Sequence, residues 1–252
     1  MTSIHGRSHA ERFLHAVIGS TLKRPSEAPD FMRSWLRHPI KYATSKAIAS
    51  VPSISFTDFF SLDHPLTVSI APSDLDRMDW NVRLDEEVIL GLAVQELKAK
   101  QIFEIGTFNG QTTKRLAEAG GIDASVYTLD VSPAEVDAFN ISYFKGHQIG
   151  EKFRGTPVES RVTQLTGDSM TFDFSPYFGK MDFVFVDAAH TYRSGIVDSR
   201  TALKLVRPGG VIFWHDFRPK WSALVHGIRE ATEGYPLMRL NATTFAVLRM
   251  PA

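Results

Sequence analysis

From about residue 84 onward, short apolar runs alternate with longer stretches whose apolar positions follow helical spacing. Apolar runs rich in β-branched and aromatic residues predict buried strands, and the stretches between them predict helices. This alternation is typical of a mostly parallel sheet that is covered on both faces. We therefore predict an α/β, Rossmann-like fold with a mostly parallel seven-stranded sheet and helices on both faces. The expected strands are 101–105, 125–130, 161–166, 182–187, 210–215, a segment near Leu237 and 244–249, and the expected helices are 84–100, 111–119, 133–139, 191–206 and 220–231.

The first 82 residues differ from the rest of the chain. Among the first fifty residues, eight are Lys or Arg and three are Asp or Glu. Helical spacing is present in 11–22 and in 30–51, where Pro39 interrupts it, and an aromatic run follows at 54–62. We predict that residues 1–82 form an N-terminal helical extension, which covers the main domain or acts as a substrate lid or dimer arm. Residues 83–252 are then the main domain.

Composition and charge exclude several classes of protein. The formal net charge is zero, so the whole chain has no electrostatic bias toward nucleic acid. There is no cysteine, which excludes disulfides, thiolate nucleophiles and cysteine metal sites. The N-terminal residues lack an apolar core of the signal-peptide type, and no long uncharged apolar run follows. We expect a cytoplasmic protein that binds neither membranes nor nucleic acid.

Residues 102–110, IFEIGTFNG, carry the most informative motif of the chain. A predicted strand containing Glu104 ends at Gly106, and Gly110 precedes a predicted helix, which is how α/β sheets build nucleotide pockets. The spacing differs from the G-x-G-x-x-G of pyrophosphate-binding loops, which disfavours an NAD-dependent enzyme. An acid beside the turn repels phosphate but suits a cationic amino-acid group. The motif thus indicates S-adenosylmethionine (SAM), which has an ammonium, a sulfonium and no phosphate.

Polar residues follow the other predicted strands, at the sheet edge where ligands bind in such folds. Asp130 ends the second strand and could accept hydrogen bonds from a ribose diol. Gly167, Asp168 and Ser169 follow the third strand, where they could contact an adenine. Each carboxylate could equally cap a helix or form a turn, but polar residues at five successive strand ends favour a binding site.

Two carboxylates and two imidazoles follow the next two predicted strands. Asp187 and His190 come after the run at 182–187, and His215 and Asp216 come after the run at 210–215. These groups suit a divalent cation, with carboxylates favouring Mg²⁺ and imidazole favouring Mn²⁺, Fe²⁺ or Zn²⁺. A metal-free site in which a histidine acts as general base is the second hypothesis. The third is that the histidines only hold loops by hydrogen bonds.

The predicted helix at 191–206 has recognisable boundaries. Ser194 is a candidate N-cap, and Pro208-Gly209-Gly210 is expected to end the helix. Asp198 is expected to be a solvated acid on its surface. Tyr192 and Arg193 either contact a substrate or are ordinary surface residues.

The motifs IFEIGTFNGQTT and YTLD resemble the first two SAM-binding motifs of class I methyltransferases. The stretch 182–216 is more distinctive: it is similar to the D-x-x-H-x-Y … L-x-P-G-G-x-I-x-x-H-D pattern of a bacterial methyltransferase family. That family is related to the catechol, caffeoyl-CoA and macrolide-sugar O-methyltransferases. In this resemblance His215-Asp216 takes the place of the Asp-Asn pair of the catechol-type enzymes. The resemblance covers about residues 84–249.

The resemblance implies a class I methyltransferase fold and SAM-dependent O-methylation of a small hydroxylated molecule, with Mg²⁺, Mn²⁺ or another divalent cation as an optional aid. The alternatives are a metal-dependent hydroxylase on the same fold and a non-catalytic SAM-binding scaffold. A homodimer is expected if the N-terminal arm finds a partner. The candidate catalytic residues are Asp187, His190 and His215; the candidate metal ligands are Asp187, His215 and Asp216; and the candidate cofactor-binding residues are Glu104, Gly106, Thr107, Phe108, Asn109, Gly110, Asp130, Val131, Gly167, Asp168, Ser169 and Asp187.

Overall fold

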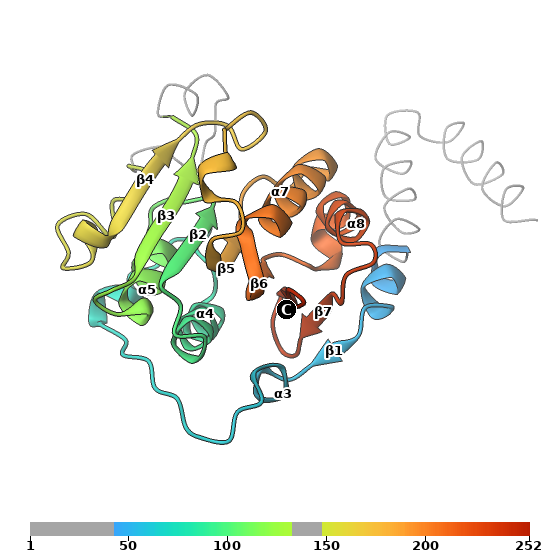
Figure 1. The fold of residues 1–252 in the computed structure, drawn as a ribbon, viewed down its shortest axis with the longest axis horizontal. Helices are drawn as coiled ribbons and strands as arrows, with labels where there is room; N and C mark the ends of the chain where they lie inside the picture. The colour runs from blue at the N-terminus through green and yellow to red at the C-terminus, as the bar shows by residue number, and fades with distance from the viewer. Residues whose placement is uncertain (1–42, 133–147) are drawn as a thin grey trace, which may run out of the picture.

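An eight-stranded sheet lies at the centre of the structure, a computed structural model that describes residues 43–132 and 148–252 (Figure 1). The strand order is β1-β7-β8-β6-β5-β2-β3-β4. All neighbouring strands are parallel except at β8, which runs antiparallel to both β6 and β7. The strands are β1 (Ser53–Ile54), β2 (Gln101–Ile105), β3 (Ser125–Asp130), β4 (Val162–Thr166), β5 (Met181–Val186), β6 (Val206–Trp214), β7 (Met238–Leu240) and β8 (Ala246–Arg249).

The prediction of an α/β fold with a mostly parallel sheet is confirmed, but the count of seven strands is one too low. The additional strand is β1, which pairs with β7 at the sheet edge. It has two residues, too few to give a periodic pattern. The last two strands, β7 and β8, pair antiparallel.

Helices cover both faces of the sheet (Figure 1). Side chains of a strand alternate between the faces: in β5, Phe183 and Phe185 pack on one side, and Val184 and Val186 on the other. The first face packs against α4 and α5, and the second packs against α7 and α8. Burying each of these large apolar side chains stabilises the fold by about 1.5–3 kcal/mol. Helices α3 (Phe56–Phe60), α4 (Leu84–Glu96), α5 (Gln111–Gly120), α7 (Tyr192–Leu205) and α8 (Ser222–Ala231) lie within the described residues.

Short 3₁₀ turns supply some of the connections. They are η2 (Pro72–Leu75), η4 (Glu159–Arg161), η5 (Ser175–Tyr177) and η6 (Pro219–Trp221). Among the described residues, none of the helices is both long and apolar enough to cross a bilayer.

Several helix boundaries differ from the expectation. Helix α7 ends at Leu205, and Pro208-Gly209-Gly210, which was expected to end it, lies within β6. Helix α4 ends at Glu96 and not at residue 100, because Lys98 adopts a left-handed conformation, with φ of 48°, and turns the chain toward β2. The N-cap of α7 is Thr191, whose hydroxyl accepts from the Ser194 amide at 3.0 Å. Ser194 was the wrong N-cap: it lies one turn inside the helix, where its hydroxyl accepts from the Thr191 amide at 3.0 Å. The two residues therefore cap each other.

The described part of the N-terminal extension packs on both faces of the sheet. Ile48 and Val51 join the cluster beneath α7 and α8, whereas Phe59 and Phe60 of α3 join the cluster beneath α4. Residues 43–49 are helical. The expected helices at 11–22 and 133–139, and most of the one at 30–51, lie outside the described residues. The division of the chain at residue 82 stays a prediction.

Candidate active site

The glycine loop after β2 lies at the switch point of the sheet, where β2 has β3 on one side and β5 on the other. Gly106 has φ of 103°, and a Cβ atom there would lie 2.2 Å from the carbonyl oxygen of Asp187. Only glycine fits between these two strand ends. Phe108, two residues later, is also left-handed, with φ of 50°. The loop therefore lies directly against the end of β5.

Asp130, at the end of β3, organises this loop. Its Oδ2 atom accepts hydrogen bonds from the amides of Thr107 at 3.0 Å and Phe108 at 2.7 Å, and its Oδ1 atom accepts from the amide of Val131 at 2.8 Å. Burial raises the pKa of Asp130, against the effect of these three bonds. Because the carboxylate already occupies the two loop amides, they are not available to a phosphate. The loop thus differs from the phosphate cradles of nucleotide folds.

Glu104 lies beneath the loop, fully buried. Its Oε2 atom accepts hydrogen bonds from the hydroxyls of Thr128 at 2.6 Å and Thr113. Burial raises the pKa of Glu104 to about 8, so the carboxyl is mostly protonated at neutral pH. The sequence argument assumed a charged acid near the cofactor. The structure instead gives a neutral group that links β2, β3 and α5.

A cavity of about 230 Å³ opens in front of the glycine loop. Its described lining includes the carboxylates of Asp130, Asp168 and Asp187 and contains neither Lys nor Arg. A pocket of this charge suits a cation without phosphates and disfavours a dinucleotide. The predicted site residues that line it are Gly106, Thr107, Phe108, Asn109, Asp130, Val131, Gly167, Asp168, Ser169, Asp187 and His190, while Glu104 and Gly110 lie outside the lining.

Sequence reasoning missed one wall of this cavity. Trp80, Asn81 and Val82, in the loop before α4, line it together with the predicted residues. Asn81 reaches the glycine loop, where its Nδ2 atom donates to Oδ1 of Asn109 at 2.9 Å. The two asparagines are 28 residues apart in the chain, so no local pattern announces the contact.

Next to the cavity, Asp187, His190 and Asp216 bring one potential metal-ligand atom each to within 4.8 Å of one another. His190 Nε2 lies 2.8 Å from Asp216 Oδ2, and the His190 ring stacks on Trp221 with centroids 4.2 Å apart. Burial alone would raise the pKa of Asp216, but the bond with His190 and the charges of His215 and Arg218 lower it. We refer to Asp187, His190 and Asp216 as the reactive cluster.

His215 lies behind the reactive cluster, and both of its ring nitrogens face carboxylates. Nδ1 is 3.1 Å from Oδ1 of Asp187, and Nε2 is 3.3 Å from Oε2 of Glu86, a fully buried residue of α4. Burial alone would lower the pKa of His215, but the charges and hydrogen bonds of these two acids, with Asp216, raise it to about 10. Both ring nitrogens of His215 therefore already have a carboxylate partner.

The predicted metal ligands were Asp187, His215 and Asp216. In the structure, the group that could hold a metal ion contains His190 in place of His215. Glu86, the partner that holds His215 back, was not anticipated. Glu86 is one of three consecutive acids at the start of α4, a pattern that favours the helix dipole and does not point to a histidine partner.

The expectation that Asp198 is a solvated acid is wrong. The residue is only 3% exposed, and burial raises the pKa of its carboxyl to about 6, against the effect of a hydrogen bond with Ser169. It faces inward because α7 packs under the loop that follows β4. Tyr192 and Arg193 are exposed, and Tyr192 hydrogen-bonds Glu230; neither lines the cavity.

Comparison with known proteins finds similarity to methyltransferases. Residues 103–217 match the model of a family described as a methyltransferase domain. This match covers somewhat less than half of the chain, and the curated relatives that resemble it are methyltransferases. The tapetum-specific methyltransferase 1 of Arabidopsis thaliana is 25% identical over 164 residues, covering 62% of this chain and 65% of the relative. The catechol O-methyltransferase of Mycobacterium tuberculosis is 25% identical over 151 residues, covering 60% and 63%.

The chain thus spans somewhat less than two thirds of the length of the two curated relatives, 65% and 63%. Its fold resembles that of the O-methyltransferase TomG from Streptomyces achromogenes, solved in complex with SAM. The TM-score is 0.50 at 21% identity, over 81% of this chain and 92% of the other. At that identity the likeness shows the Rossmann-like methyltransferase fold.

Proposed function

We propose that this protein transfers a methyl group from SAM to a hydroxyl of a small molecule. The observation that carries the proposal is the charge of the cavity at the switch point. Its described lining contains three carboxylates and neither Lys nor Arg, and the reactive cluster lies beside it. SAM presents two positive charges and no phosphate, so it suits this cavity. The related O-methyltransferases support the same reading.

The cofactor would lie across the glycine loop. Gly106 keeps the loop flat against the end of β5, and Asp130 would accept the ribose hydroxyls with the lone pairs that the loop amides leave free. Asp168 and Ser169, on the far side of the cavity, would contact the adenine. This arrangement leaves Asp187 and His190 at the end where the methyl group would be transferred.

Methyl transfer is an in-line displacement, so the acceptor hydroxyl must lose its proton and lie close to the sulfonium. Positioning alone can lower such a barrier by roughly 7–11 kcal/mol. The reactive cluster has the chemistry to hold the hydroxyl at this place. Asp187 is fixed by His215, and His190 is fixed by Asp216 and by its stacking on Trp221.

The two carboxylates and the imidazole fit a divalent cation, with the imidazole favouring Mn²⁺ over Mg²⁺. Asp187, His190 and Asp216 would hold it, and a bound cation would supply Lewis acidity that lowers the pKa of the hydroxyl. Without a cation, His190 is the proton acceptor and Asp216 stabilises the imidazolium that forms. His215 does neither in this proposal: it orients Asp187.

A transfer assay tests the function. Metal-stripped protein is incubated with methyl-labelled SAM and a panel of phenols, sugars and polyketides, with and without Mg²⁺ or Mn²⁺. We expect label in at least one hydroxylated acceptor. Restoration by a cation assigns the metal role, and full activity without one assigns the proton to His190. Absence of transfer across the panel, together with turnover that needs 2-oxoglutarate, would instead support the hydroxylase.

The variant Asp216→Asn separates cofactor binding from methyl transfer. Asp216 belongs to the reactive cluster but does not line the cavity, so the variant should bind S-adenosylhomocysteine normally and lose transfer. If the variant turned over at the wild-type rate, the reactive cluster would have no part in the chemistry.

A further inference from the structure

The loop before α4 forms a wall of the cofactor cavity although it contains little regular structure. Between η2 and α4 the backbone has only turns and bends. Its last residues, Trp80, Asn81 and Val82, line the cavity. We call residues 74–82 the clamp loop. Something other than backbone pairing must hold it in place.

Arg77 lies at the centre of the clamp loop. Its guanidinium donates to the backbone carbonyls of Asp74, at 3.1 Å, and of Val82, so it joins the two ends of the loop. The same group forms an ion pair with Glu87 of α4, with Nη1 2.6 Å from Oε2. The Arg77 side chain is 17% exposed and that of Glu87 is fully buried. One side chain therefore closes the loop and attaches it to the domain.

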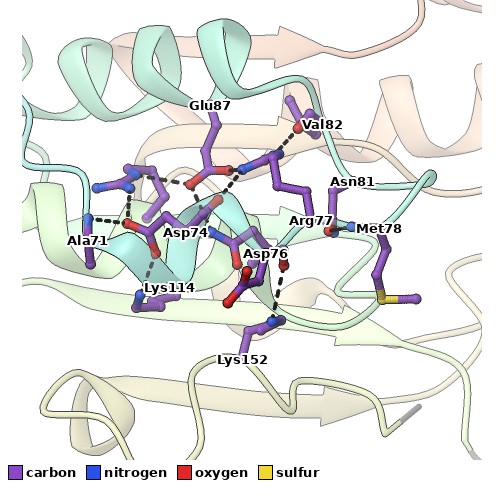
Figure 2. A network of polar contacts seen from close by, with 12 residues as sticks. Ala71, Asp74, Asp76, Arg77, Met78, Asn81, Val82, Glu87, Lys114 and Lys152 are labelled. Carbon is purple, nitrogen blue, oxygen red and sulfur yellow. Dashed lines mark hydrogen bonds and ion pairs between the residues drawn. The ribbon is translucent and has the colours of Figure 1, made fainter. Parts of the chain in front are cut away.

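Asp74 attaches the beginning of the loop to α5. Its Oδ1 atom lies 2.6 Å from Nζ of Lys114, and its Oδ2 atom lies 2.7 Å from Nη2 of Arg115. Arg115 also pairs with Glu87, at 3.1 Å from Nε to Oε1, so the two acids share one cation. We call Asp74, Arg77, Glu87, Lys114 and Arg115 the clamp network. Figure 2 shows its labelled members Asp74, Arg77, Glu87 and Lys114.

The other end of the loop contacts the glycine loop. Oδ1 of Asn81 accepts from the amide of Met78 at 2.9 Å, while its Nδ2 atom donates to Asn109, itself a lining residue. On the outer side, Nζ of Lys152 donates to the carbonyl of Asp76 at 3.3 Å. The cavity wall is thereby connected, through a continuous set of polar contacts, to a buried ion network.

We propose that the clamp network sets cofactor affinity at a distance, with Arg77 as a positioning residue that touches no ligand. Arg77 does not line the cavity, but it bonds the carbonyl of Val82, the last of the three loop residues that do. Because the loop is ordered by its own contacts, the cofactor does not have to order it on binding, which is the general advantage of a preorganised site. This inference rests on the proposed function, since it requires the cavity to bind SAM.

The test compares Arg77→Met with Arg161→Met. Arg161 is also half-buried and also donates to two backbone carbonyls, those of Ala117 and Gly121, but it lies at the far end of α5, away from the cavity. Calorimetric titration with S-adenosylhomocysteine should give a dissociation constant about tenfold higher for Arg77→Met and unchanged for Arg161→Met. Arg77→Lys should recover only part of the affinity, because an ammonium cannot bridge the carbonyls and Glu87 as the guanidinium fork does.

Amide hydrogen exchange provides the structural readout. In Arg77→Met, protection should fall in residues 74–82 and remain in β2 and β5. Wild-type affinity in a variant whose loop has lost protection would overturn the proposal, because the loop would then be only a cover. An equal loss of affinity in the Arg161→Met control would also overturn the proposal.

A milder variant serves if Arg77→Met does not fold. Lys152→Met removes one contact on the outer side of the loop and should weaken binding by about twofold to threefold, with faster exchange in the loop. Unchanged affinity and exchange in this variant would contradict the proposal. Failure of the wild-type protein to bind the probe is a different result, since it would refute the proposed function itself.

Discussion

Two groups of buried charge lie beside the cavity, and their charges are balanced differently. In the clamp network, the acids Asp74 and Glu87 each pair with two cations, all within 3.1 Å. Around the reactive cluster, the acids Glu86, Asp187 and Asp216 share two imidazoles and the partly exposed Arg218. The clamp network is complete as it stands, whereas the reactive cluster retains capacity for a cation or a proton. The comparison separates charge that holds the fold from charge that can do chemistry.

The largest expected effect is on the clamp network. Arg115→Met leaves Asp74 and Glu87 buried without the cation they share. We expect the free energy of unfolding to fall by about 3–5 kcal/mol, the usual cost of breaking a buried ion pair on one side. Urea unfolding measures this. His190→Ala in the reactive cluster should cost far less, and equal losses in the two variants would remove the distinction.

In the reactive cluster, a substitution should reduce activity much more than stability. Asp216→Asn is expected to reduce methyl transfer by about 10²–10⁴-fold, the range of a lost acid–base or orienting group. Its free energy of unfolding should fall less than that of Arg115→Met, because the amide oxygen can still accept from Arg218. Steady-state rates and urea unfolding on one preparation check both halves. A variant that loses stability in proportion to activity would mean that the cluster is structural.

The glycine loop should be intolerant of a single methyl group. In Gly106→Ala the Cβ atom would meet the Asp187 carbonyl at 2.2 Å, so binding of S-adenosylhomocysteine should be lost. Gly121→Ala is the matched control: its φ of 75° is also left-handed, but its Cβ would have no neighbour within 4 Å. The control should cost only about 1–2 kcal/mol of stability, from backbone strain, and should bind normally. Similar binding by both variants would show that the close approach is unimportant.

The pH dependence of stability should have opposite signs at two buried acids. The bonds and charges of Lys114 and Arg115 outweigh burial and lower the pKa of Asp74 to about 2, so its contribution is present above pH 3.8 and is lost as pH falls toward 2. Burial raises the pKa of Asp198 to about 6, so the folded state keeps a proton that the unfolded state has lost, and stability falls as pH rises from 3.8 to 6.

Variants of these two acids test the sign. Asp198→Asn should gain about 2–3 kcal/mol relative to wild type between pH 4 and pH 7, since one pKa unit corresponds to about 1.4 kcal/mol. Asp74→Asn should lose stability relative to wild type at pH 7 and much less at pH 2. Unfolding curves across this range give the result, and a parallel shift of both variants with pH would contradict the assignment.

Most of the fold could be predicted because its signals are local. Seven of the eight strands have enough apolar residues for a pattern, whereas the two residues of β1 do not. Asp130, Asp168 and Asp187 were also predictable as cavity residues, because parallel strand ends meet at one edge of the sheet.

What the sequence did not reveal depends on contacts between distant residues. The clamp loop reaches the cavity through pairs such as Arg77 with Glu87 and Asn81 with Asn109, which leave no periodic signal. His190 and His215 both follow strands, and the second carboxylate partner of His215, Glu86, comes from a helix 129 residues away in the chain. The acceptor, the dimer and the cytoplasmic location stay predictions.

The central claim is that an acid-lined cavity at the switch point binds a cationic cofactor. Calorimetric titration with SAM, S-adenosylhomocysteine and NAD tests it most directly. We predict micromolar dissociation constants for the first two, as usual for such ligands, and no heat from NAD. Binding of NAD, or of none of the three, would contradict the account and leave the glycine loop as a structural turn.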